Sequence, residues 1–398
     1  MFEPLAPLAA DPILGLMALY QQDQNPNKVD LGVGVYKNDA GETPVLACIK
    51  QAEERLFHNE LTKAYVGPAG CLTYNAQMAT LLLGESHQAL QDGRFALVQT
   101  PGGCGALRVA AELVKVVNPN ARIWVSDPTW GNHIPLLGNS GLDIASYPYF
   151  DPVSNGLKFE EMMSTLAHVG PGDLVLLHGC CHNPTGVDLT REQWQAVAHL
   201  AQERGFTPFV DIAYQGFGAG VDADAYGLRL LADTLPEVVV AVSCSKNFGV
   251  YRERVGAVAF LGQNEDSAHA IKSHLLSIVR GIYSMPPAHG AMLVAEVLGD
   301  PALKQQWLTE LADMRQRIAS LRQQFVREMN QRGADGRFDF VSRQSGMFSF
   351  LGLSEEQVVR LRQESSIFLV GAGRASIAGL NSRNMAYVCD AISAIVKT

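Results

Sequence analysis

The chain of 398 residues carries a formal net charge of −9, with 47% apolar and 18% charged residues. Because this length exceeds what one hydrophobic core usually fills, we expect a large domain and a smaller one. The acidic balance argues against a nucleic-acid partner, and the ordinary apolar content leaves no room for long disorder.

Segments that would direct the chain to a membrane or out of the cell are not evident. The sequence has no run of about eighteen apolar residues, and its start lacks the basic region and cleavage site of a signal peptide. The seven cysteines are scattered without a C-x-x-C pattern, and the ten histidines form no metal-binding pair. We therefore expect a cytoplasmic protein without a bound metal.

The N-terminal part contains an apolar stretch, residues 29–45, in which Gly32 and Gly34 interrupt a short strand. A glycine inside a strand often marks the close approach of a ligand or of another backbone. A loop without any ligand explains this pattern equally well.

Residues 94–262 alternate between apolar runs and helical stretches. The runs are 95–100, 123–127, 143–149, 173–179, 206–214, 238–246 and 255–262. Near-continuous apolar runs separated by helices predict an α/β fold, with a mostly parallel sheet and helices on both faces. In such sheets ligands bind beyond the carboxyl ends of the strands.

The C-terminal part begins with apolar residues at steps of three and four from Leu303 to Met329, which predict one long helix ended by Gly333. Residues 338–353 and 366–380 read as strands, with a helix between them and a last helix after Asn384. We expect 41–300 to form the large domain, 301–398 a smaller α/β domain, and 1–40 to pack with the latter.

Lys246 ends the apolar run that begins at Val238. Burial lowers the pKa of a lysine, which makes its amine a nucleophile toward a carbonyl. Taken alone, the lysine is explained more simply as the point where the strand leaves the core.

The stretch from Gln99 to Arg108 places three glycines between a strand and a helix. Backbone N–H groups and the helix dipole at such a junction favour a phosphate. The next strand ends in Asp127, at nearly the spacing of an acid that binds a ribose. An NAD-dependent dehydrogenase or a nucleotide-binding module is therefore the alternative function.

Asp211, Tyr214 and Asn183 also follow strands. A carboxylate there can hold a protonated ring nitrogen and a phenol a ring oxygen, although Asp211 could equally cap a turn. Proline after Asn183 favours an extended backbone that displays its side chain. Trp130 could stack on a planar ring or lie in the core.

Arg374 lies among small and apolar residues, and Arg280 precedes a Pro286–Pro287 break. Both could clamp carboxylates in a bidentate manner. A surface role explains Arg280 just as well.

Together these motifs resemble a known family from end to end. The chain is similar to the class I aspartate and aromatic amino-acid aminotransferases of fold type I, which use pyridoxal phosphate. The motifs that carry the resemblance are SCSKNFGVYRERVG, DIAYQGFG, CCHNPTG, TPGGCGALR, DPTWGNH, LGVGVYK and YSMPPAHGA. The nucleotide-binding alternative explains only the glycine-rich turn.

The resemblance implies catalytic roles for Lys246, Asp211 and Tyr214. Lys246 would attach to pyridoxal phosphate as an imine and later move the Cα proton of the substrate. Asp211, supported by His133, would keep the pyridine nitrogen protonated. Tyr214 and Asn183 would donate hydrogen bonds to the phenolic oxygen.

The same resemblance implies a phosphate site and a homodimer. Trp130 would stack on the cofactor ring, and the active sites would lie at the subunit interface. The phosphate would be held by Gly103, Cys104, Ser243, Ser245, Arg254 and, from the second subunit, Tyr65.

For the substrate, the resemblance implies that the α-carboxylate meets Arg374, Asn183 and the backbone near Gly34, with Trp130 beside it. Arg280 of the second subunit would meet a distal carboxylate. The implied reaction is a ping-pong transfer of the amino group of aspartate or an aromatic amino acid to 2-oxoglutarate.

Three positions depart from the aspartate-selective pattern. Cys104, Met285 and Ala64 replace polar residues, and a deformable Met285 favours a site that also accepts aromatic side chains. We expect broad specificity without a fixed preference between aspartate and aromatic donors. A β-lyase or a decarboxylase on the same fold is a second possibility.

Overall fold

The computed structural model describes residues 1–8, 12–371 and 373–397, which form two compact units. The large unit comprises 44–183 and 187–316, and the small unit comprises 1–43, 184–186 and 317–398. The small unit therefore draws on both ends of the chain. The domain limits expected at residues 40 and 300 stay predictions.

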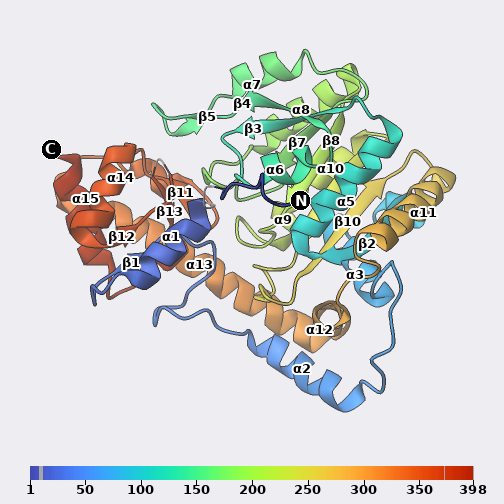
Figure 1. The fold of residues 1–398 in the computed structure, drawn as a ribbon, viewed down its shortest axis with the longest axis horizontal. Helices are drawn as coiled ribbons and strands as arrows, with labels where there is room; N and C mark the ends of the chain where they lie inside the picture. Colours follow the sequence, from blue (N-terminus) through green and yellow to red (C-terminus); the bar gives the residue numbers. More distant parts are fainter. Residues whose placement is uncertain (9–11, 372, 398) are drawn as a thin grey trace. The chain divides into compact units, whose positions relative to one another are not determined.

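A seven-stranded sheet runs through the large unit in the order β2-β10-β9-β8-β7-β3-β4 (Figure 1). All neighbours are parallel except β10, which is antiparallel to both β2 and β9. The strands are β2 (Phe95–Pro101), β3 (Arg122–Asp127), β4 (Asp143–Pro148), β7 (Leu174–His178), β8 (Thr207–Ile212), β9 (Val238–Ser243) and β10 (Val255–Leu261).

The sheet is covered on both faces by helices, as its apolar strands require. Every residue of β9 and β10 is buried. The helices around the sheet form two groups, and the members of each group contact one another. The first group consists of α5 (Gly102–Val117), α6 (His133–Gly138) and α11 (Glu265–Ile282). The other contains α2 (Ala47–Asn59), α3 (Leu72–Leu83), α7 (Phe159–Leu166), α8 (Arg191–Arg204), α10 (Tyr226–Thr234) and α12 (Ala288–Gly299). The expected α/β fold is confirmed.

The small unit contains two short sheets and several helices. Strand β1 (Val29–Asp30) is parallel to β12 (Ile367–Phe368), and β11 (Phe348–Phe350) is antiparallel to β13 (Arg374–Ser376). Its helices are α1 (Pro12–Gln22), the second half of α13 (Pro301–Gln331), α14 (Glu355–Ser365) and α15 (Met385–Val396). The remaining short elements of the chain are α4 (Gln88–Gln91), β5 (Phe150–Asp151), β6 (Gly156–Leu157), α9 (Val221–Asp224) and the 3₁₀ turns Asp339–Arg343 and Ile377–Gly379.

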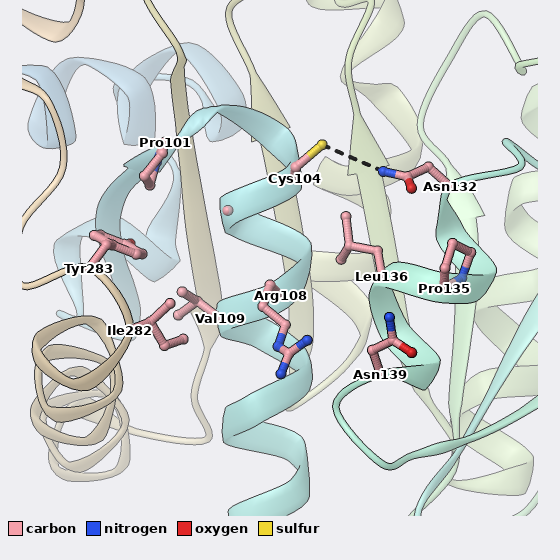
Figure 2. Close-up of a pocket in the computed structure, with 11 residues that line it drawn as sticks. Pro101, Cys104, Arg108, Val109, Asn132, Pro135, Leu136, Asn139, Ile282 and Tyr283 are labelled. Carbon is pink, nitrogen blue, oxygen red and sulfur yellow. Dashed lines mark hydrogen bonds between the residues drawn. The ribbon is translucent and has the colours of Figure 1, made fainter. Parts of the chain in front are cut away.

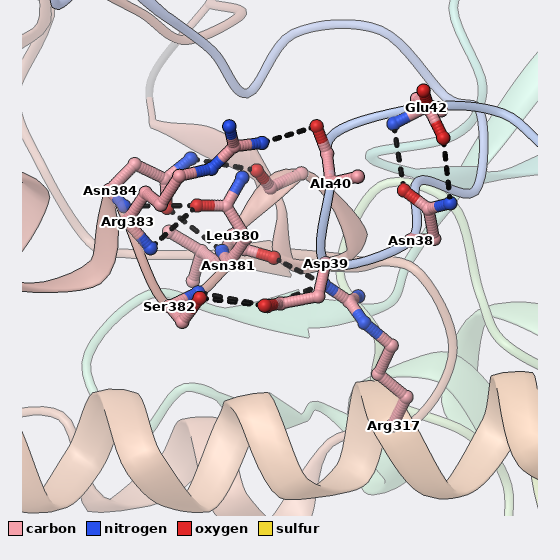
Figure 3. Close-up of polar contacts among 11 residues, drawn as sticks. Asn38, Asp39, Ala40, Glu42, Arg317, Leu380, Asn381, Ser382, Arg383 and Asn384 are labelled. Atoms are coloured by element: carbon pink, nitrogen blue, oxygen red, sulfur yellow. Dashed lines mark hydrogen bonds and ion pairs between the residues drawn. The ribbon is translucent and has the colours of Figure 1, made fainter.

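Polar contacts join two loops of the small unit to α13 (Figure 3). The carboxylate of Asp39 accepts hydrogen bonds from the backbone N–H and the hydroxyl of Ser382, at 2.9 and 2.6 Å. Arg317 on α13 donates to the carbonyl of Leu380 at 2.9 Å. These bonds fix the N-terminal loop against the segment that precedes α15.

The long helix begins where the pattern predicts it. The carboxylate of Asp300 accepts from the backbone N–H groups of Ala302 and Leu303, both at 2.9 Å, which satisfies two free donors of the first turn. Gly333, with φ of +78°, lies just beyond the last turn.

The strands expected over 338–353 and 366–380 are present, but they are much shorter than those regions. The first region begins with a 3₁₀ turn at Asp339–Arg343 and contains only β11, and the second contains β12 and β13 with residue 372 outside the described part. Gly346 and Gly373 have φ of +73° and +93°, which bends the backbone out of extended geometry.

Within the described ranges, no helix combines the length and apolar character needed to cross a membrane.

Trp307 anchors the first half of α13 to the chain that follows Lys246. Its indole N–H donates to the carbonyl of Asn247 at 2.7 Å, and its ring stacks on Phe248 with centroids 4.5 Å apart. We expect Trp307→Phe to lower the free energy of unfolding by about 2 kcal/mol, because a buried carbonyl loses its donor and a void remains. Chemical unfolding of the cofactor-free protein measures this loss.

The exposed Gln305→Ala, on the same helix, serves as the control and should stay within about 0.5 kcal/mol of the parent. Equal stability of Trp307→Phe and Gln305→Ala would contradict the anchoring role.

Candidate active site at the carboxyl edge of the sheet

One edge of the sheet carries most of the side chains singled out from the sequence. Parallel strands β2, β3, β7, β8 and β9 all end there, and the antiparallel β10 begins there. Val255 at the start of β10 pairs with Pro101, and Gly256 pairs with Ser243. The loop that joins β9 to β10 therefore lies beside the first turn of α5.

A group of hydrogen-bond donors forms an anion cradle, which consists of the first turn of α5, Ser243, Ser245 and Arg254. The two serine hydroxyls are 3.1 Å apart, and the Arg254 guanidinium donates to the Ser245 hydroxyl at 3.3 Å. Gly102 has φ of +69°, and a Cβ there would lie 2.5 Å from the Arg254 guanidinium. Free N–H groups of a helix start, two hydroxyls and a guanidinium suit a phosphate.

Lys246 follows Ser245 in the loop after β9 and is partly buried. Desolvation lowers the pKa of its amine, while the charge of Asp211 opposes this effect. The Nζ atom lies 4.9 Å from the centroid of the Tyr214 ring. A lowered pKa increases the neutral fraction of the amine, which is its nucleophilic and proton-accepting form.

Asp211, near the end of β8, is buried and paired with His133. Burial alone would raise the pKa of this carboxyl, but the hydrogen bond from His133 and nearby positive charge hold it below its usual range. The His133 Nε2 atom is 2.9 Å from the carboxylate, and its Nδ1 atom is 2.8 Å from the hydroxyl of Thr129. The carboxylate thus stays ionised in a buried place, where it can hold a positively charged ring nitrogen.

Two further histidines, His178 and His182, line the ends of β3 and β7. The His178 ring is 3.2 Å from the Thr129 hydroxyl, and the His182 ring is 3.0 Å from the Ser126 hydroxyl. Burial lowers the pKa of His178 to about 3 and that of His182 well below its usual range. Both rings are therefore neutral at pH 7 and add no charge beside Asp211.

Asn183 and Trp130 lie at the same edge. Asn183 is buried, five residues beyond the end of β7 at His178. The Trp130 ring is partly buried and packs edge-on against His133, with centroids 5.2 Å apart.

Cys104 lies in the first turn of α5 and borders a pocket (Figure 2). The amide of Asn132 faces its sulfur at 3.9 Å, and Ile282 and Tyr283 line the other side of α5. Gly103 lies against Ser243, since a Cβ there would be 3.1 Å from the Ser243 Cβ.

In the small unit, Arg374 and Gly34 meet through Phe348. The buried Arg374 donates to the carbonyl of Gly32 at 2.6 Å, and its guanidinium carbon lies 4.4 Å from the centroid of the Phe348 ring. A Cβ on Gly34 would lie 2.8 Å from the same ring. An arginine fixed in this way is suited to a carboxylate.

Tyr65 and Arg280 are exposed on the single chain. Tyr65 is 90% exposed, and Arg280, in the last turn of α11, donates to the hydroxyl of Ser284. The single chain thus leaves both side chains at its surface.

Several residues that hold the candidate side chains of each unit in place were missed from the sequence. Thr129 carries no sequence signal, because only the fold brings it between His133 and His178. Phe348 reads as an ordinary apolar strand residue. Arg322 had a usable signal, since it lies four residues after Ile318 and three before Phe325 on the apolar face of α13.

The structure also gathers three potential metal donors, Cys180, Cys181 and Asp224, whose ligand atoms lie within 4.8 Å of one another. The Asp224 carboxylate already accepts from three backbone N–H groups, of Gly216, Gly218 and Ala219. The hydrogen bond of Cys180 with Cys181 and the burial of Cys180 raise the pKa of the Cys180 thiol well above its usual range. This group is better suited to holding a loop than to holding a metal.

Comparison with known proteins gives full-length matches. Residues 26–392 match the family model "Aminotransferase class I and II". The chain is 46% identical to an aspartate aminotransferase of Salmonella typhi, with 100% of both chains covered. It is 46% identical to an aromatic-amino-acid aminotransferase of Pseudomonas aeruginosa, covering 99% of this chain and 98% of that one.

A solved structure agrees with these matches. The aromatic-amino-acid aminotransferase of Burkholderia pseudomallei, covalently bound to pyridoxal phosphate, has a TM-score of 0.97. It is 41% identical and covers 99% of each chain. The dehydrogenase alternative is not supported.

The Asp211–His133 pair predicts a pH-dependent stability. Because the folded pKa of Asp211 is lowered, its stabilisation is present above the unfolded value of about 4 and is lost as the pH falls through the folded value. We expect His133→Leu to lose about 3 kcal/mol at pH 7, with the loss shrinking as the pH falls below 4. Urea unfolding of the cofactor-free protein at several pH values measures the difference.

The exposed His168→Gln is the control and should show no such trend. A loss for His133→Leu that is constant from pH 7 to pH 3 would show that the pair does not control Asp211.

Proposed function

Because the chain belongs to the class I and II aminotransferases, it is a transaminase, and we propose that it moves the amino group of aspartate or an aromatic amino acid to 2-oxoglutarate. The observation that carries this proposal is Lys246, whose amine has a lowered pKa and which lies between Ser245 and Arg254, two members of the anion cradle.

The residues of the large unit fit pyridoxal phosphate, the cofactor of the reaction. The anion cradle suits its phosphate, the Lys246 amine its aldehyde, and the ionised Asp211 its ring nitrogen. When bound, this cofactor supplies an aldehyde that accepts amino groups and a ring that withdraws electrons from the substrate Cα.

The side chains of the protein then move and hold protons. Lys246 Nζ takes the Cα proton of the bound amino acid and returns a proton in the second half of the ping-pong reaction, which its lowered pKa favours. Asp211, kept ionised by His133, holds the proton of the ring nitrogen.

We propose supporting roles for the remaining site residues of the large unit. Tyr214 and Asn183 donate to the phenolic oxygen, and Trp130 stacks on the ring. The backbone of Gly103 and Cys104 contributes to the phosphate site, which their place in the first turn of α5 supports.

For substrate binding we propose Arg374 and the backbone near Gly34, together with Asn183 and Trp130. The cation–π contact of Arg374 with Phe348 supports this role, because it fixes the plane of the guanidinium. The deformable Met285 favours acceptance of aromatic side chains as well as carboxylates.

We also propose a homodimer in which Tyr65 and Arg280 act in the active site of the partner. Their exposure on the single chain supports this arrangement. A cytoplasmic location is proposed as well, supported by seven cysteines that are all free thiols.

Replacing the lysine tests the reaction. We expect Lys246→Ala to lower the rate of transfer from aspartate to 2-oxoglutarate at least about a thousandfold, because the proton-transfer group is lost. Chromatography of both amino acids and both oxo acids measures the rate and the one-to-one stoichiometry. The exposed Lys272→Ala is the control and should keep parental activity.

Full activity of Lys246→Ala would refute the assignment. Parental protein that consumes amino acids without an oxo-acid acceptor would instead identify a lyase or a decarboxylase.

Mixed dimers test the role of Arg280. We expect Arg280→Ala to lower kcat/KM for aspartate about a hundredfold and that for phenylalanine less than about threefold, because only aspartate has a distal carboxylate. Co-expression of Lys246→Ala with Arg280→Ala chains should restore about a quarter of the parental aspartate activity, since half of the dimers carry one intact site. No recovery in the mixture would show that Arg280 does not serve the partner.

A further inference from the structure

Arg322 is a buried arginine in the second half of α13 that the reaction itself does not use. It is only 2% exposed. Its Nη1 atom donates to the carbonyl of Val341 at 3.1 Å and to the hydroxyl of Ser349 at 2.5 Å. Its Nη2 atom donates to the carbonyls of Ser345, Gly346 and Phe348, at 3.1, 2.8 and 2.7 Å.

The guanidinium donates to backbone carbonyls that would accept from a neighbouring strand if the sheet were longer. The chain curls at Gly346, where φ is +73°, so several carbonyls turn toward α13. Buried carbonyls require donors, and one planar guanidinium supplies them from two nitrogen atoms. The desolvation cost of the charge is offset by the number of hydrogen bonds it makes.

The segment that Arg322 holds is the one that seats Arg374. Strand β11 begins at Phe348 and pairs antiparallel with β13, so that Phe350 faces Arg374 in register. Each strand has three residues, and a two-stranded sheet of this size is not stable by itself. The guanidinium carbon of Arg374 lies 4.4 Å from the centroid of the Phe348 ring. This position therefore depends on the hydrogen bond that Arg322 donates to the Phe348 carbonyl.

The same ring and turn fix two other segments of the small unit. The ring of Phe348 fills the space against Gly34, where a Cβ would lie 2.8 Å from it. The backbone N–H of Ser345 donates to the carbonyl of Gly186 at 2.9 Å, and a Cβ on Gly186 would lie 2.4 Å from the Phe348 carbonyl oxygen.

We propose that Arg322 is a positioning residue for the α-carboxylate of the substrate. Its hydrogen bonds hold the turn 345–349 in place. The Phe348 ring then fixes the positions of the Arg374 guanidinium and of the backbone at Gly34. A bidentate arginine–carboxylate pair tolerates little misplacement. Loss of the Arg322 hydrogen bonds therefore weakens carboxylate binding, although Arg322 does not contact the substrate. The inference rests on the proposed function.

The test compares Arg322→Lys with the parental holoenzyme. Lysine keeps the charge but presents its hydrogens from one point instead of a planar fork. We expect KM for aspartate and for phenylalanine to rise by the same factor of about ten, because both donors share the α-carboxylate, while kcat changes less than about threefold. The Kd of the non-reacting monocarboxylate 3-phenylpropionate, measured by calorimetry, should rise about tenfold too.

Phe325→Leu is the matched control for loss of stability. Phe325 is buried on the same helix and packs against Phe338, with ring centroids 5.7 Å apart. It should lower the thermal midpoint yet leave both KM values and the Kd within about twofold of the parent.

The inference is overturned if folded Arg322→Lys keeps parental KM and Kd values, or if Phe325→Leu raises them as much. If Arg322→Lys does not accumulate as folded protein, Ser349→Ala decides, since it removes one acceptor of Arg322. A rise of about threefold in KM for both donors supports the proposal, and unchanged values overturn it. A parental enzyme without transaminase activity would instead refute the proposed function.

Discussion

The parallel alignment of β2, β3, β7, β8 and β9 is the constraint on which the site depends. It brings five strand ends to one edge, so residues far apart in the chain meet there without long loops. The single antiparallel strand, β10, adds its own beginning to that edge, which places Arg254 beside the first turn of α5. Ser245, Lys246 and Arg254 thus share one loop, which lies beside the first turn of α5.

The same edge must satisfy two opposite electrostatic demands. Desolvation lowers the pKa of Lys246, whereas the pKa of Asp211 is held low in spite of burial. The hydrogen bond from His133 resolves the conflict locally. Burial keeps His178 and His182 neutral, so neither ring adds charge, and His178 contacts the Thr129 hydroxyl that is hydrogen-bonded to His133.

The residues at strand ends could be predicted because an apolar run that stops at a polar side chain leaves a visible mark. Lys246, Asp211 and Asn183 all carry that mark, and the α/β fold follows from the same runs. The turn held by Arg322 could not be predicted, because its carbonyls are satisfied by a guanidinium from another element and not by a neighbouring strand. Apolar content alone therefore suggested strands over 338–353, where the backbone forms a 3₁₀ turn and only one short strand, β11. Thr129 was equally hidden, since its two histidine partners meet it only in the folded chain.

The discontinuity of the small unit has a consequence for folding during synthesis. The large unit is encoded almost without interruption, so β8, which carries Asp211, and β9, which precedes Lys246, can pair before α13 is complete. Strand β1, by contrast, waits for β12 from the far end of the chain. A ribosome-bound intermediate would then contain a folded large unit with β1 still unpaired. Because β13, which carries Arg374, lies near the same end of the chain, we expect Arg374 to reach its final position late, after that long loop has closed.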